Sequence, residues 1–374
     1  MRTFSKSCLV LDARKAFDSG IGTYIRNLVP FFKQEFDLRL IGDKQKLEVF
    51  DCQVIHSASS TYSLSDFYQP SFLSGKCDVF WTPHFNYPIW PVKAKLKLAT
   101  VHDMYHLAHF EKLSTAQKMY AKLVIAHTLK ATDSIFTISE FTKSEILRFF
   151  PKTPSDKIEV VHLAVDNTFF KPTSSENEIQ NLKTNYQLPD NYVLFVGNLK
   201  HNKNAISLVK AIEALHFKGK NYHHKLVIAG KKEGFRIGDN EVIDYIKNHK
   251  LEHLVHFTGF VNESDLPILY SAASLFVFPS LYEGFGLPPL EAIACGCPVL
   301  CSNMASIPEV CGNSTFYFDA QNTESLTNEL EKLLANKELR KTKSDTAKEW
   351  IKQYDWSLTA EKHINIIKEG LSKI

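Results

Sequence analysis

The stretch that decides the fold is Leu275–Ala294, with the sequence LFVFPSLYEGFGLPPLEAIA. Its first residues form a continuous apolar run, which is typical of a buried strand in a parallel sheet. Gly284, Gly286 and two prolines then predict a turn that leads into a helix from about Pro289. Glycines at such a strand-to-helix turn let backbone N–H groups approach an anion, so the stretch predicts an α/β fold with a binding site at this turn.

Two carboxylates in the same stretch predict contacts with a polar ligand. Glu283 lies in the turn and Glu291 lies in the first turns of the helix, so both side chains can reach one ligand. Carboxylates bind vicinal hydroxyls of sugars well, because each accepts two hydrogen bonds. The alternative is an ordinary acidic surface loop, and the Tyr, Phe and Leu residues around these acids argue against it.

Outward from this stretch, short apolar or β-branched runs alternate with amphipathic segments along the chain. This alternation predicts βαβ units and parallel sheets. In the second half the expected strands are Tyr192–Val196, Lys225–Ala229, Val255–Thr258, Leu275–Phe278, Pro298–Cys301 and Thr315–Phe318. In the first half the expected elements are strands Ser7–Leu11, Leu38–Ile41, Asp78–Trp81, Leu96–Val101, Ser134–Thr137 and Lys157–Val161, with helices at Gly22–Gln34, Thr115–Ala131 and Glu140–Phe149.

The length of 374 residues predicts two domains rather than one. Residues 166–189 contain Pro172, Pro189 and many Ser, Glu and Asn residues, which is the composition of a linker. Two α/β halves of similar size joined by one linker suggest a ligand in the crevice between them, since ligands of open parallel sheets bind outside the carboxyl ends of the strands.

Composition and charge exclude several other classes of protein. A chain that is 44% hydrophobic and 23% charged is globular rather than disordered. No apolar run approaches the ~20 residues needed to span a bilayer, and Cys8–Leu11 is too short for the core of a signal peptide. The net charge of +3 gives no indication of nucleic-acid binding. The cysteines near residues 295–311 lack the spacing of zinc sites and are interpreted as buried thiols.

The spacing E-x7-E, read here as Glu283-Gly-Phe-Gly-Leu-Pro-Pro-Leu-Glu291, resembles the donor-binding signature of family 4 of the retaining glycosyltransferases. The sequence CGCPVLCSNMASIPEVCG at residues 295–312 is similar to the usual continuation in that family. The resemblance covers most of the chain and is strongest from Val193 to Gly312. It implies the GT-B architecture, in which two Rossmann-like domains with parallel sheets face a central cleft.

This architecture implies the bounds of the two domains. In GT-B proteins the last helix often packs on the first domain, and the residues after Trp356 have apolar side chains at helical spacings. We therefore expect an acceptor-side domain of residues 1–165 plus 355–374, and a nucleotide-sugar domain of residues 166–354.

The resemblance also implies roles for the residues of the E-x7-E stretch. Glu291 would hold the ribose hydroxyls of a nucleotide, and Glu283 would contact the donor sugar. The donor sugar or its diphosphate would contact the backbone of Gly284, Phe285, Gly286 and Leu287. The residues by themselves predict the same chemistry, because carboxylates suit hydroxyls and backbone amides suit phosphates.

A second motif, VGNLKHNKN at residues 196–204, follows an expected strand and opens a helix. Lys203 near a helix N-terminus can neutralise a diphosphate whose charge grows as the glycosidic bond breaks. The family usually has a lysine here with an arginine nearby, but this chain has asparagines at the arginine positions. Asn198 and Lys200 are therefore included as candidate donor contacts. A solvated helix start is the alternative interpretation.

Two motifs of the first half are candidates as well. In DSGIGTY at residues 18–24, Gly20 and Gly22 allow an exposed backbone at a helix start, and the family has a similar glycine loop near the donor phosphates or the acceptor. In TVHDMYH at residues 100–106, His102 follows a strand and aligns with the histidine that family members use at the donor sugar. Asp103 follows it as in many members. A structural His–Asp capping pair is the alternative.

Three further residues are candidate acceptor or cleft positions. His84 lies just past a strand in WTPHFNYP, where Tyr87 and other aromatic residues either stack on a sugar or line the cleft. Ser139 in FTISEFTKSE is first a helix cap and second a candidate near the phosphate or the acceptor.

Together these features favour a retaining hexosyltransferase with His102, Asp103, Lys203 and Glu283 as catalytic groups. No D-x-D carboxylate pair appears, so no metal is expected. The alternatives are a nucleotide-sugar epimerase or phosphorylase of the same fold, or a non-catalytic two-lobe sugar-binding protein. The lack of an export signal and the lysine loop argue against the binding protein.

The motifs look most like those of bacterial mannosyl- and rhamnosyltransferases that build surface polysaccharides such as lipopolysaccharide. We therefore expect GDP-mannose as the donor, no cofactor, and a glycan or lipid-linked saccharide as the acceptor. A lipid-linked acceptor predicts a cytoplasmic protein at the inner face of the membrane. Phe149 and Phe150, close to Arg148 and Lys152, are either part of the membrane contact or a buried helix end.

Overall fold

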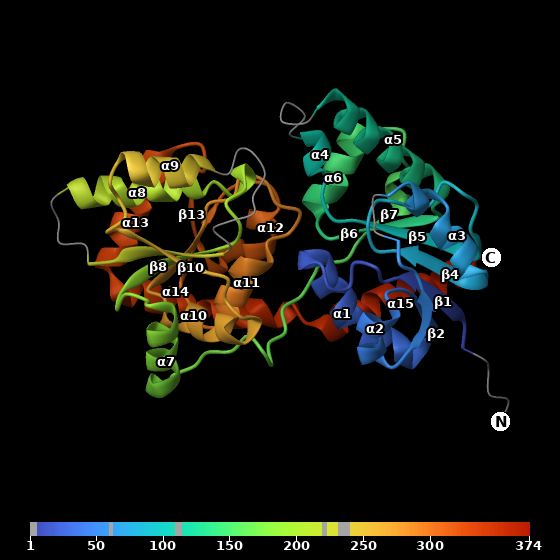
Figure 1. Cartoon of the computed structure of the whole chain (residues 1–374), viewed down its shortest axis with the longest axis horizontal. Helices are drawn as coiled ribbons and strands as arrows, with labels where there is room; N and C mark the ends of the chain where they lie inside the picture. Colours follow the sequence, from blue (N-terminus) through green and yellow to red (C-terminus); the bar gives the residue numbers. More distant parts are fainter. Residues whose placement is uncertain (1–5, 60–62, 109–113, 219–222, 231–239) are drawn as a thin grey trace. The chain divides into compact units, whose positions relative to one another are not determined.

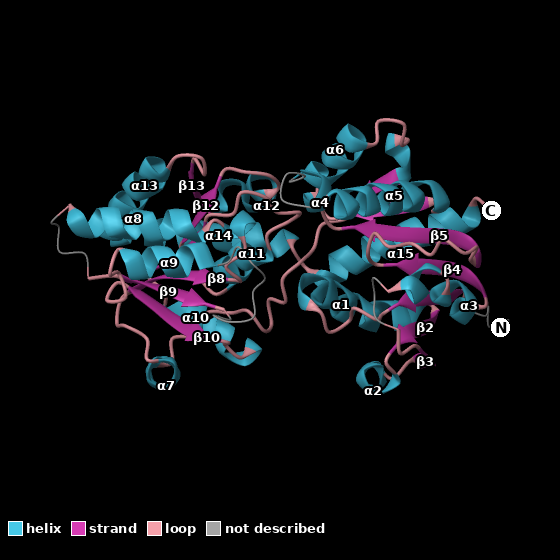
Figure 2. Ribbon diagram, turned by 45° about the horizontal axis from the view of Figure 1, so that its top comes forward, coloured by secondary structure: helices cyan, strands magenta, loops and turns pink. Residues whose placement is uncertain are grey.

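The computed structural model describes residues 6–59, 63–108, 114–218, 223–230 and 240–374. The chain forms two units, one of residues 1–164 with 354–374 and one of residues 165–353. These bounds lie one residue away from the expected ones. Each unit contains one parallel sheet with helices on both faces, which is the arrangement of a Rossmann-like domain (Figure 2).

The sheet of the first unit has seven parallel strands in the order β3-β2-β1-β4-β5-β6-β7. Its strands are β1 (Cys8–Asp12), β2 (Asp37–Gly42), β3 (Gln53–His56), β4 (Lys76–Thr82), β5 (Lys93–Val101), β6 (Ser134–Thr137) and β7 (Ile158–Val160). The strands at its centre are buried on both faces, as their continuous apolar runs predict. Because all strands run the same way, the residues that follow them gather at one edge of the sheet.

Several of the helices that cover this sheet begin after a residue whose side chain caps the helix, among them Asp43, Ser139 and Asp355. The helices are α1 (Ser19–Glu35), α2 (Lys44–Leu47), α3 (Gln69–Ser74), α4 (Tyr105–Ala108), α5 (Thr115–Ala131), α6 (Glu140–Phe149) and α15 (Trp356–Ser372). Ser114 and Gln117 form a reciprocal capping box at the start of α5. Among the described residues, no helix of the protein is both long enough and apolar enough to cross a membrane.

Helix α15 packs beside α1 although the two are far apart in the sequence (Figure 1). The Tyr24 hydroxyl of α1 donates to His363 Nε2 of α15 over 2.6 Å, and His363 Nδ1 donates to the Thr359 carbonyl over 2.7 Å. The His363 ring also stacks on Trp81 of the sheet, with ring centres 5.3 Å apart. Burial lowers the pKa of His363 to about 3, so this histidine is neutral at physiological pH.

The sheet of the second unit has six parallel strands in the order β10-β9-β8-β11-β12-β13. Its strands are β8 (Tyr192–Val196), β9 (Lys225–Ala229), β10 (Val255–Gly259), β11 (Leu275–Phe278), β12 (Val299–Ser302) and β13 (Phe316–Phe318). Its helices are α7 (Glu176–Tyr186), α8 (Ala205–Phe217), α9 (Asn240–Asn248), α10 (Leu266–Ala272), α11 (Leu287–Ala294), α12 (Ile307–Cys311), α13 (Thr323–Ala335) and α14 (Lys337–Trp350).

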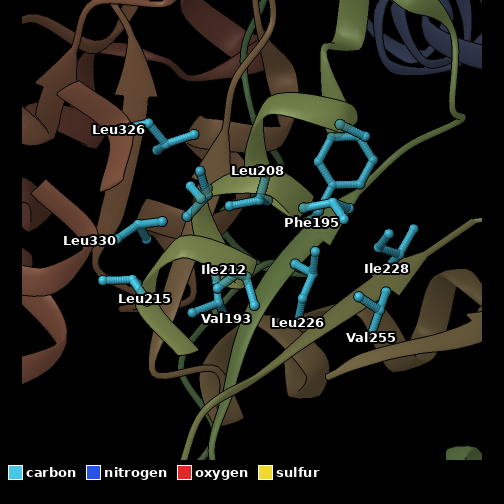
Figure 3. Packing of buried hydrophobic residues seen from close by; sticks show 14 of the residues in the cluster. Val193, Phe195, Leu208, Ile212, Leu215, Leu226, Ile228, Val255, Leu326 and Leu330 are labelled. Atoms are coloured by element: carbon cyan, nitrogen blue, oxygen red, sulfur yellow. The ribbon is translucent and has the colours of Figure 1, made fainter. Parts of the chain in front are cut away.

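One face of this sheet packs against α8 and α13 in a continuous hydrophobic core (Figure 3). Phe195 of β8 and Ile228 of β9 contribute from the sheet, and Leu208 and Leu330 contribute from the helices. All four side chains are at most 1% exposed. This close packing holds the loops after β8 and β11 on a rigid base.

Every strand expected from the sequence is present, with ends shifted by at most three residues. Two predictions about the rest of the chain were incomplete or wrong. Strand β3 was not predicted, because its QVIH sequence is half exposed at the sheet edge and lacks an apolar run. The stretch 166–189 is not only a linker, since it contains helix α7, which Ser175 caps and which packs beside α10. Leu182 is the buried residue of this helix.

Candidate active site

The loops that follow β8 and β11 are tied together at the carboxyl edge of the second sheet. The Leu281 N–H donates to the Asn202 carbonyl over 2.7 Å. The Asn202 side chain donates in return to the Tyr282 carbonyl over 3.2 Å. Strands β8 and β11 are also direct neighbours in the sheet. The two motifs predicted to bind the donor are therefore parts of one structure.

An ion pair joins two of the predicted site residues across these loops. Lys203 lies in a 3-10 turn after β8, and its Nζ is 2.6 Å from Glu283 Oε1. The two side chains are 20% and 14% exposed, so they are accessible to a ligand. The lysine ammonium also lies 5.3 Å from the centre of the Phe278 ring. An ammonium has three N–H donors, so the contact with Glu283 leaves two for a second anion.

The turn from Glu283 to Gly286 is fixed by backbone contacts. The Ser306 hydroxyl lies 2.9 Å from the Glu283 carbonyl and 2.8 Å from the Phe285 carbonyl, and it donates to one of them at a time. Gly286 has a φ of +115°, which side chains other than glycine rarely adopt. The glycine thus permits the sharp entry into α11 that the sequence predicts.

Helix α11 begins at Leu287 rather than at the expected Pro289, so both prolines lie inside its first turn. Proline is tolerated there because the first helical N–H groups have no partner within the helix. Pro288 and Pro289 nevertheless have no N–H, so Leu287 supplies the donor that remains in the first three positions. Binding of an anion at this helix start therefore depends on the side chain of Lys203. At a typical helix N-terminus, backbone N–H groups would supply more of the donors.

Glu291 lies on α11 with its carboxylate held by a neighbouring helix. Its Oε2 accepts a hydrogen bond of 2.9 Å from the hydroxyl of the buried Tyr270 on α10. Burial raises the pKa of Glu291 to about 7, although the hydrogen bond from Tyr270 acts in the opposite direction. Near neutral pH the carboxyl is thus present in both protonation states. Its predicted contact with ribose stays a prediction.

Replacing Glu291 by Gln should raise the stability of the unliganded protein at alkaline pH. The pKa of Glu291 in the folded state lies above the ordinary value of 4.5, so the folded protein favours the neutral carboxyl, which Gln resembles. The stability given by the neutral form is complete below pH 4.5 and is lost as the pH rises through 7. Thermal melts should show a higher Tm for Glu291→Gln above pH 7 and little difference below 4.5.

The same variant should bind nucleotide less tightly if Glu291 accepts bonds from ribose hydroxyls. The loss should be roughly 1–3 kcal/mol, the scale of a hydrogen bond to a charged group. Isothermal titration with the nucleotide measures it, and unchanged affinity would contradict the ribose assignment. The exposed Glu338→Gln is the matched control, and it should change neither the Tm profile nor the affinity.

The other two candidates in the loop after β8 differ from Lys203. Lys200 is exposed, and Asn198 has a buried Oδ1 without a hydrogen-bond partner among the described residues. Within that part of the chain, no hydrogen bond links Asn198 or Lys200 to the Lys203–Glu283 pair. The loop is shaped instead by a close approach of backbones, since a Cβ on Gly230 would lie 2.2 Å from the Gly197 carbonyl oxygen.

In the first unit, His102 follows β5 and is held in one tautomer. Its Nε2 donates to the Pro83 carbonyl over 2.9 Å, which leaves Nδ1 as an acceptor. Burial lowers the pKa of His102 to about 4, so the ring is neutral at physiological pH. The Tyr24 ring packs edge-on against it at 5.2 Å. His102 can therefore accept a hydrogen bond from a hydroxyl.

Asp103, the neighbour of His102, has a local structural contact. Its Oδ1 accepts a hydrogen bond of 3.0 Å from the Tyr105 N–H at the start of α4. Its negative charge acts on His102 by raising the histidine pKa, against the stronger effect of burial. These contacts correspond to the structural alternative for the His–Asp pair, and a catalytic role for Asp103 stays a prediction.

Gly20 and Gly22 lie inside helix α1, which begins three residues earlier than expected. A Cβ on Gly22 would lie 2.8 Å from the Ala16 carbonyl, and the Gly22 N–H donates to the Asp18 carbonyl over 2.7 Å. Gly22 is therefore required for packing. Gly20 is exposed, with open space where a Cβ would be, so packing does not explain this glycine.

The three predicted acceptor positions are buried. His84 Nδ1 accepts from the Asn86 N–H over 3.2 Å, which directs its protonated Nε2 toward Asp12 Oδ2 at 3.4 Å. Tyr87 is 3% exposed, and burial raises the pKa of its hydroxyl. Ser139 caps α6 by accepting from the Thr142 N–H over 3.0 Å. The capping role predicted for Ser139 is thus present, and none of the three side chains is open to solvent.

A buried ionic network at the carboxyl edge of the first sheet was not predicted. Arg14 donates to both carboxylate oxygens of Asp12, over 2.8 Å and 2.6 Å, and also donates to Asp66. Asn86 donates to the second oxygen of Asp66 over 3.3 Å. The signal in the sequence is the pair Asp12 and Arg14 directly after the first strand, where the strand ends of a parallel sheet gather charged groups.

This network positions the segment that holds His102. Asp12 faces His84, and the residue before His84 is Pro83, whose carbonyl accepts from His102. Burial alone would raise the pKa of Asp12, but the charge and hydrogen bonds of Arg14, with a smaller effect of His84, hold it well below its usual range. Asp12 is therefore ionised, and it anchors the loop that fixes the tautomer of His102.

Two family models match the chain, one in each unit. The model described as Glycosyltransferase Family 4 matches residues 23–169, and the model described as Glycosyl transferases group 1 matches residues 176–350. Together they cover most of the sequence, and the chain belongs to this family of glycosyltransferases. The recognition made from the E-x7-E stretch is thereby confirmed.

Similar proteins agree with this assignment. O-antigen chain mannosyltransferase B of Escherichia coli is 28% identical over 327 residues, which are 87% of this chain and 81% of that protein. The serotype-specific mannosyltransferase WbdA of Escherichia coli is 32% identical over 243 residues, 65% of this chain but only 29% of that protein. Sucrose-phosphate synthase from Thermosynechococcus elongatus has the same fold, with a TM-score of 0.79 and 17% identity over 99% of this chain and all of that one. The expected GT-B fold class is confirmed.

Proposed function

We propose that this glycosyltransferase transfers mannose from GDP-mannose to a glycan or a lipid-linked saccharide, retaining the anomeric configuration and needing no metal ion. The observation that carries the proposal is the Lys203–Glu283 ion pair, which lies at the carboxyl edge of the second sheet in the same loop structure that leads to Glu291. The similarity to an O-antigen chain mannosyltransferase and to a serotype-specific mannosyltransferase supports mannose as the sugar.

The residues of the second unit supply groups for each part of a nucleotide sugar. Lys203 has two N–H donors available for the diphosphate, and the Leu287 N–H adds one from the helix start. Glu283 and Glu291 are acceptors for hydroxyls of the sugar and of the ribose. In the first unit, Nδ1 of His102 is an acceptor for a hydroxyl.

The reaction we propose is a front-face displacement. The acceptor hydroxyl oxygen forms a bond to the anomeric carbon as the bond from that carbon to the diphosphate oxygen breaks. The hydroxyl proton passes to the departing diphosphate, whose growing charge Lys203 stabilises. Each glutamate already has a protein partner, Lys203 for Glu283 and Tyr270 for Glu291, so neither is proposed as a covalent nucleophile.

A panel of donors with product analysis tests the substrate. The protein is incubated with GDP, UDP or dTDP and with the corresponding sugars, and the shift in Tm reports binding, because a ligand stabilises the folded state in proportion to its occupancy. GDP and GDP-mannose should give the largest shifts. Transfer of mannose with α-linked product supports retention, whereas epimerised donor without transfer would favour an epimerase instead.

Turnover should persist in excess chelator. The charge of the leaving diphosphate is proposed to be met by Lys203 and backbone N–H groups, so removal of divalent cations should change the initial rate less than twofold, about the scale of ordinary assay variation. Initial rates are measured with and without EDTA. A tenfold loss that manganese restores would show that a metal ion takes part.

A further inference from the structure

A buried histidine of the last helix takes no part in the chemistry proposed above. His363 of α15 is fully buried, and its ring lies against the rings of Trp81 and Phe136, with centres 5.3 Å and 4.5 Å away. An apolar side chain at this position would avoid the cost of burying a polar ring. Packing alone therefore does not account for a histidine here.

His363 belongs to a buried chain of hydrogen bonds that runs from α15 to strand β5. The Trp81 indole N–H donates to the Thr100 hydroxyl over 3.0 Å. The Tyr24 hydroxyl donates to His363 Nε2 over 2.6 Å, and His363 Nδ1 donates to the Thr359 carbonyl over 2.7 Å. Burial raises the pKa of Tyr24 well above its usual value, and a side-chain hydrogen bond from Thr100 acts in the opposite direction. This bond from Thr100 to Tyr24 joins the two parts of the chain.

The hydrogen bonds of this chain all point in one direction. The Thr359 carbonyl can only accept, so the His363 proton lies on Nδ1 and leaves Nε2 as the acceptor for Tyr24. The indole N–H of Trp81 can only donate, so the Thr100 hydroxyl accepts from it and gives its own proton to Tyr24. A buried network whose polar groups all have partners holds its members in one arrangement.

Tyr24 connects this chain to His102. The Tyr24 ring lies edge-on against the His102 ring, with centres 5.2 Å apart and planes at 90°. Thr100, the other member of the chain nearby, lies two residues before His102 on the same stretch of chain. The Pro83 carbonyl holds Nε2 of His102, and the Tyr24 ring packs against the side of the imidazole. These two contacts together determine where Nδ1 of His102 points.

We infer that Tyr24 and His363 are positioning residues, which hold the His102 ring in the orientation that presents Nδ1 as a hydrogen-bond acceptor. They act through His102 and need no contact with the substrate. A misplacement of about 1 Å can lower turnover by up to about 10²-fold, so a reacting group requires a rigid support. The inference rests on the proposed function in one respect, that His102 contacts the substrate.

Removing both partners of the Tyr24–His363 hydrogen bond separates positioning from stability. In the double variant Tyr24→Phe/His363→Leu both side chains are apolar, so its Tm should lie close to that of the wild type. The single variant Tyr24→Phe leaves Nε2 of His363 buried without a donor and should lower the Tm. In both variants kcat should fall about tenfold, because the ring beside His102 is no longer tied to α15. Nucleotide affinity, measured by isothermal titration, should stay unchanged, since its predicted contacts lie in the second unit.

The protonation of His102 gives a readout that does not depend on turnover. Burial lowers its pKa to about 4, so the ring of the wild type should stay neutral at about pH 5.5. In the double variant the looser ring at position 24 admits water, and the pKa of His102 should rise toward its ordinary value of 6.5. NMR of protein labelled at the histidine nitrogens measures this pKa, and the spectrum of His102→Gln assigns the signal. Asp103, His84 and Lys15 also act on the pKa of His102, and they are the same in both proteins.

Phe32→Leu is the matched control for a loosened core. This buried ring of α1 packs against Trp81 and His363 and, within the described part of the chain, has no ring contact with His102. The variant keeps the hydrogen-bond chain, so its Tm should fall while kcat and the pKa of His102 stay at the wild-type values.

Two results would overturn the inference, a wild-type kcat in the double variant or an unchanged pKa of His102. The chain of hydrogen bonds would then only fasten α15 to its unit. If the wild type transfers no sugar from any donor, the proposed function fails, and the pKa of His102 in the double variant still decides the inference.

Discussion

Replacing Lys203 by Ala is expected to lower kcat by roughly 10²–10³-fold, the cost of removing one preorganised electrostatic group from a developing charge. The expectation follows from two features of the loops after β8 and β11. Lys203 is already oriented by Glu283 at 2.6 Å, so no reorganisation is needed when the diphosphate departs. The two prolines of α11 remove backbone donors that would otherwise share this task. Steady-state kinetics with saturating donor measure the effect.

Two companion variants separate catalysis from stability. Lys210→Ala removes an exposed lysine on the adjacent helix α8 and should leave kcat unchanged. Glu283→Gln keeps the shape of the side chain but removes the charge that orients Lys203, so its kcat should fall by less than that of Lys203→Ala. If Lys203→Ala keeps normal turnover and a normal melt, the charge of the leaving group is met elsewhere and the proposed role is wrong.

Replacing Arg14 by Ala is expected to destabilise the first unit by about 3–5 kcal/mol, because two buried carboxylates lose their counter-charge. The Arg14 and Asp66 side chains are each 3% exposed, and that of Asp12 is 1% exposed. A loss of this size should lower the Tm by roughly 10 °C. Thermal melts followed by circular dichroism check it.

Two controls check this prediction, a variant of an exposed ion pair and a series of melts at acidic pH. Lys368→Ala breaks an ion pair in the same unit, but Lys368 is 53% exposed and its partner Glu35 is 42% exposed, so the change should be small. The pKa of Asp12 lies well below its usual range, so the stability that this carboxylate contributes is present above the ordinary value of 3.8 and is lost as the pH falls further. The difference in Tm between Arg14→Ala and the wild type should therefore become smaller at acidic pH. A difference in Tm between Arg14→Ala and the wild type that stays constant as the pH falls below 3.8 would contradict the ionic explanation.

Much of the fold could be predicted from the sequence because its signals are local. Strands such as Leu275–Phe278 are continuous apolar runs, and turns such as Glu283–Gly286 contain the glycines and prolines that the backbone requires. Strand β3 lacks such a run, because it is half exposed at the edge of the sheet, where it pairs with β2 alone. Helix α7 was not predicted because its sequence is mostly polar, with Leu182 as its buried residue.

The candidate site shows the same division between local and distant contacts. The spacing of Glu283 and Glu291 identified the loop, but nothing near Glu291 in the sequence indicated Tyr270, which is 21 residues away. The buried Arg14 was missed because a charged residue after a strand is usually exposed, and its burial depends on Asp66, 52 residues later. Such partners become visible only when separate elements are placed side by side.

Helix α15 has a consequence for the order in which the protein is made. The first unit includes residues 354–374, and the ring of His363 covers Trp81 and Phe136 of its sheet. A ribosome completes residues 165–353 before it makes these residues, so the second unit can finish folding while the first still exposes aromatic side chains. A stop codon near residue 354 should therefore leave the second unit intact and make the first, although synthesised earlier, the part that aggregates.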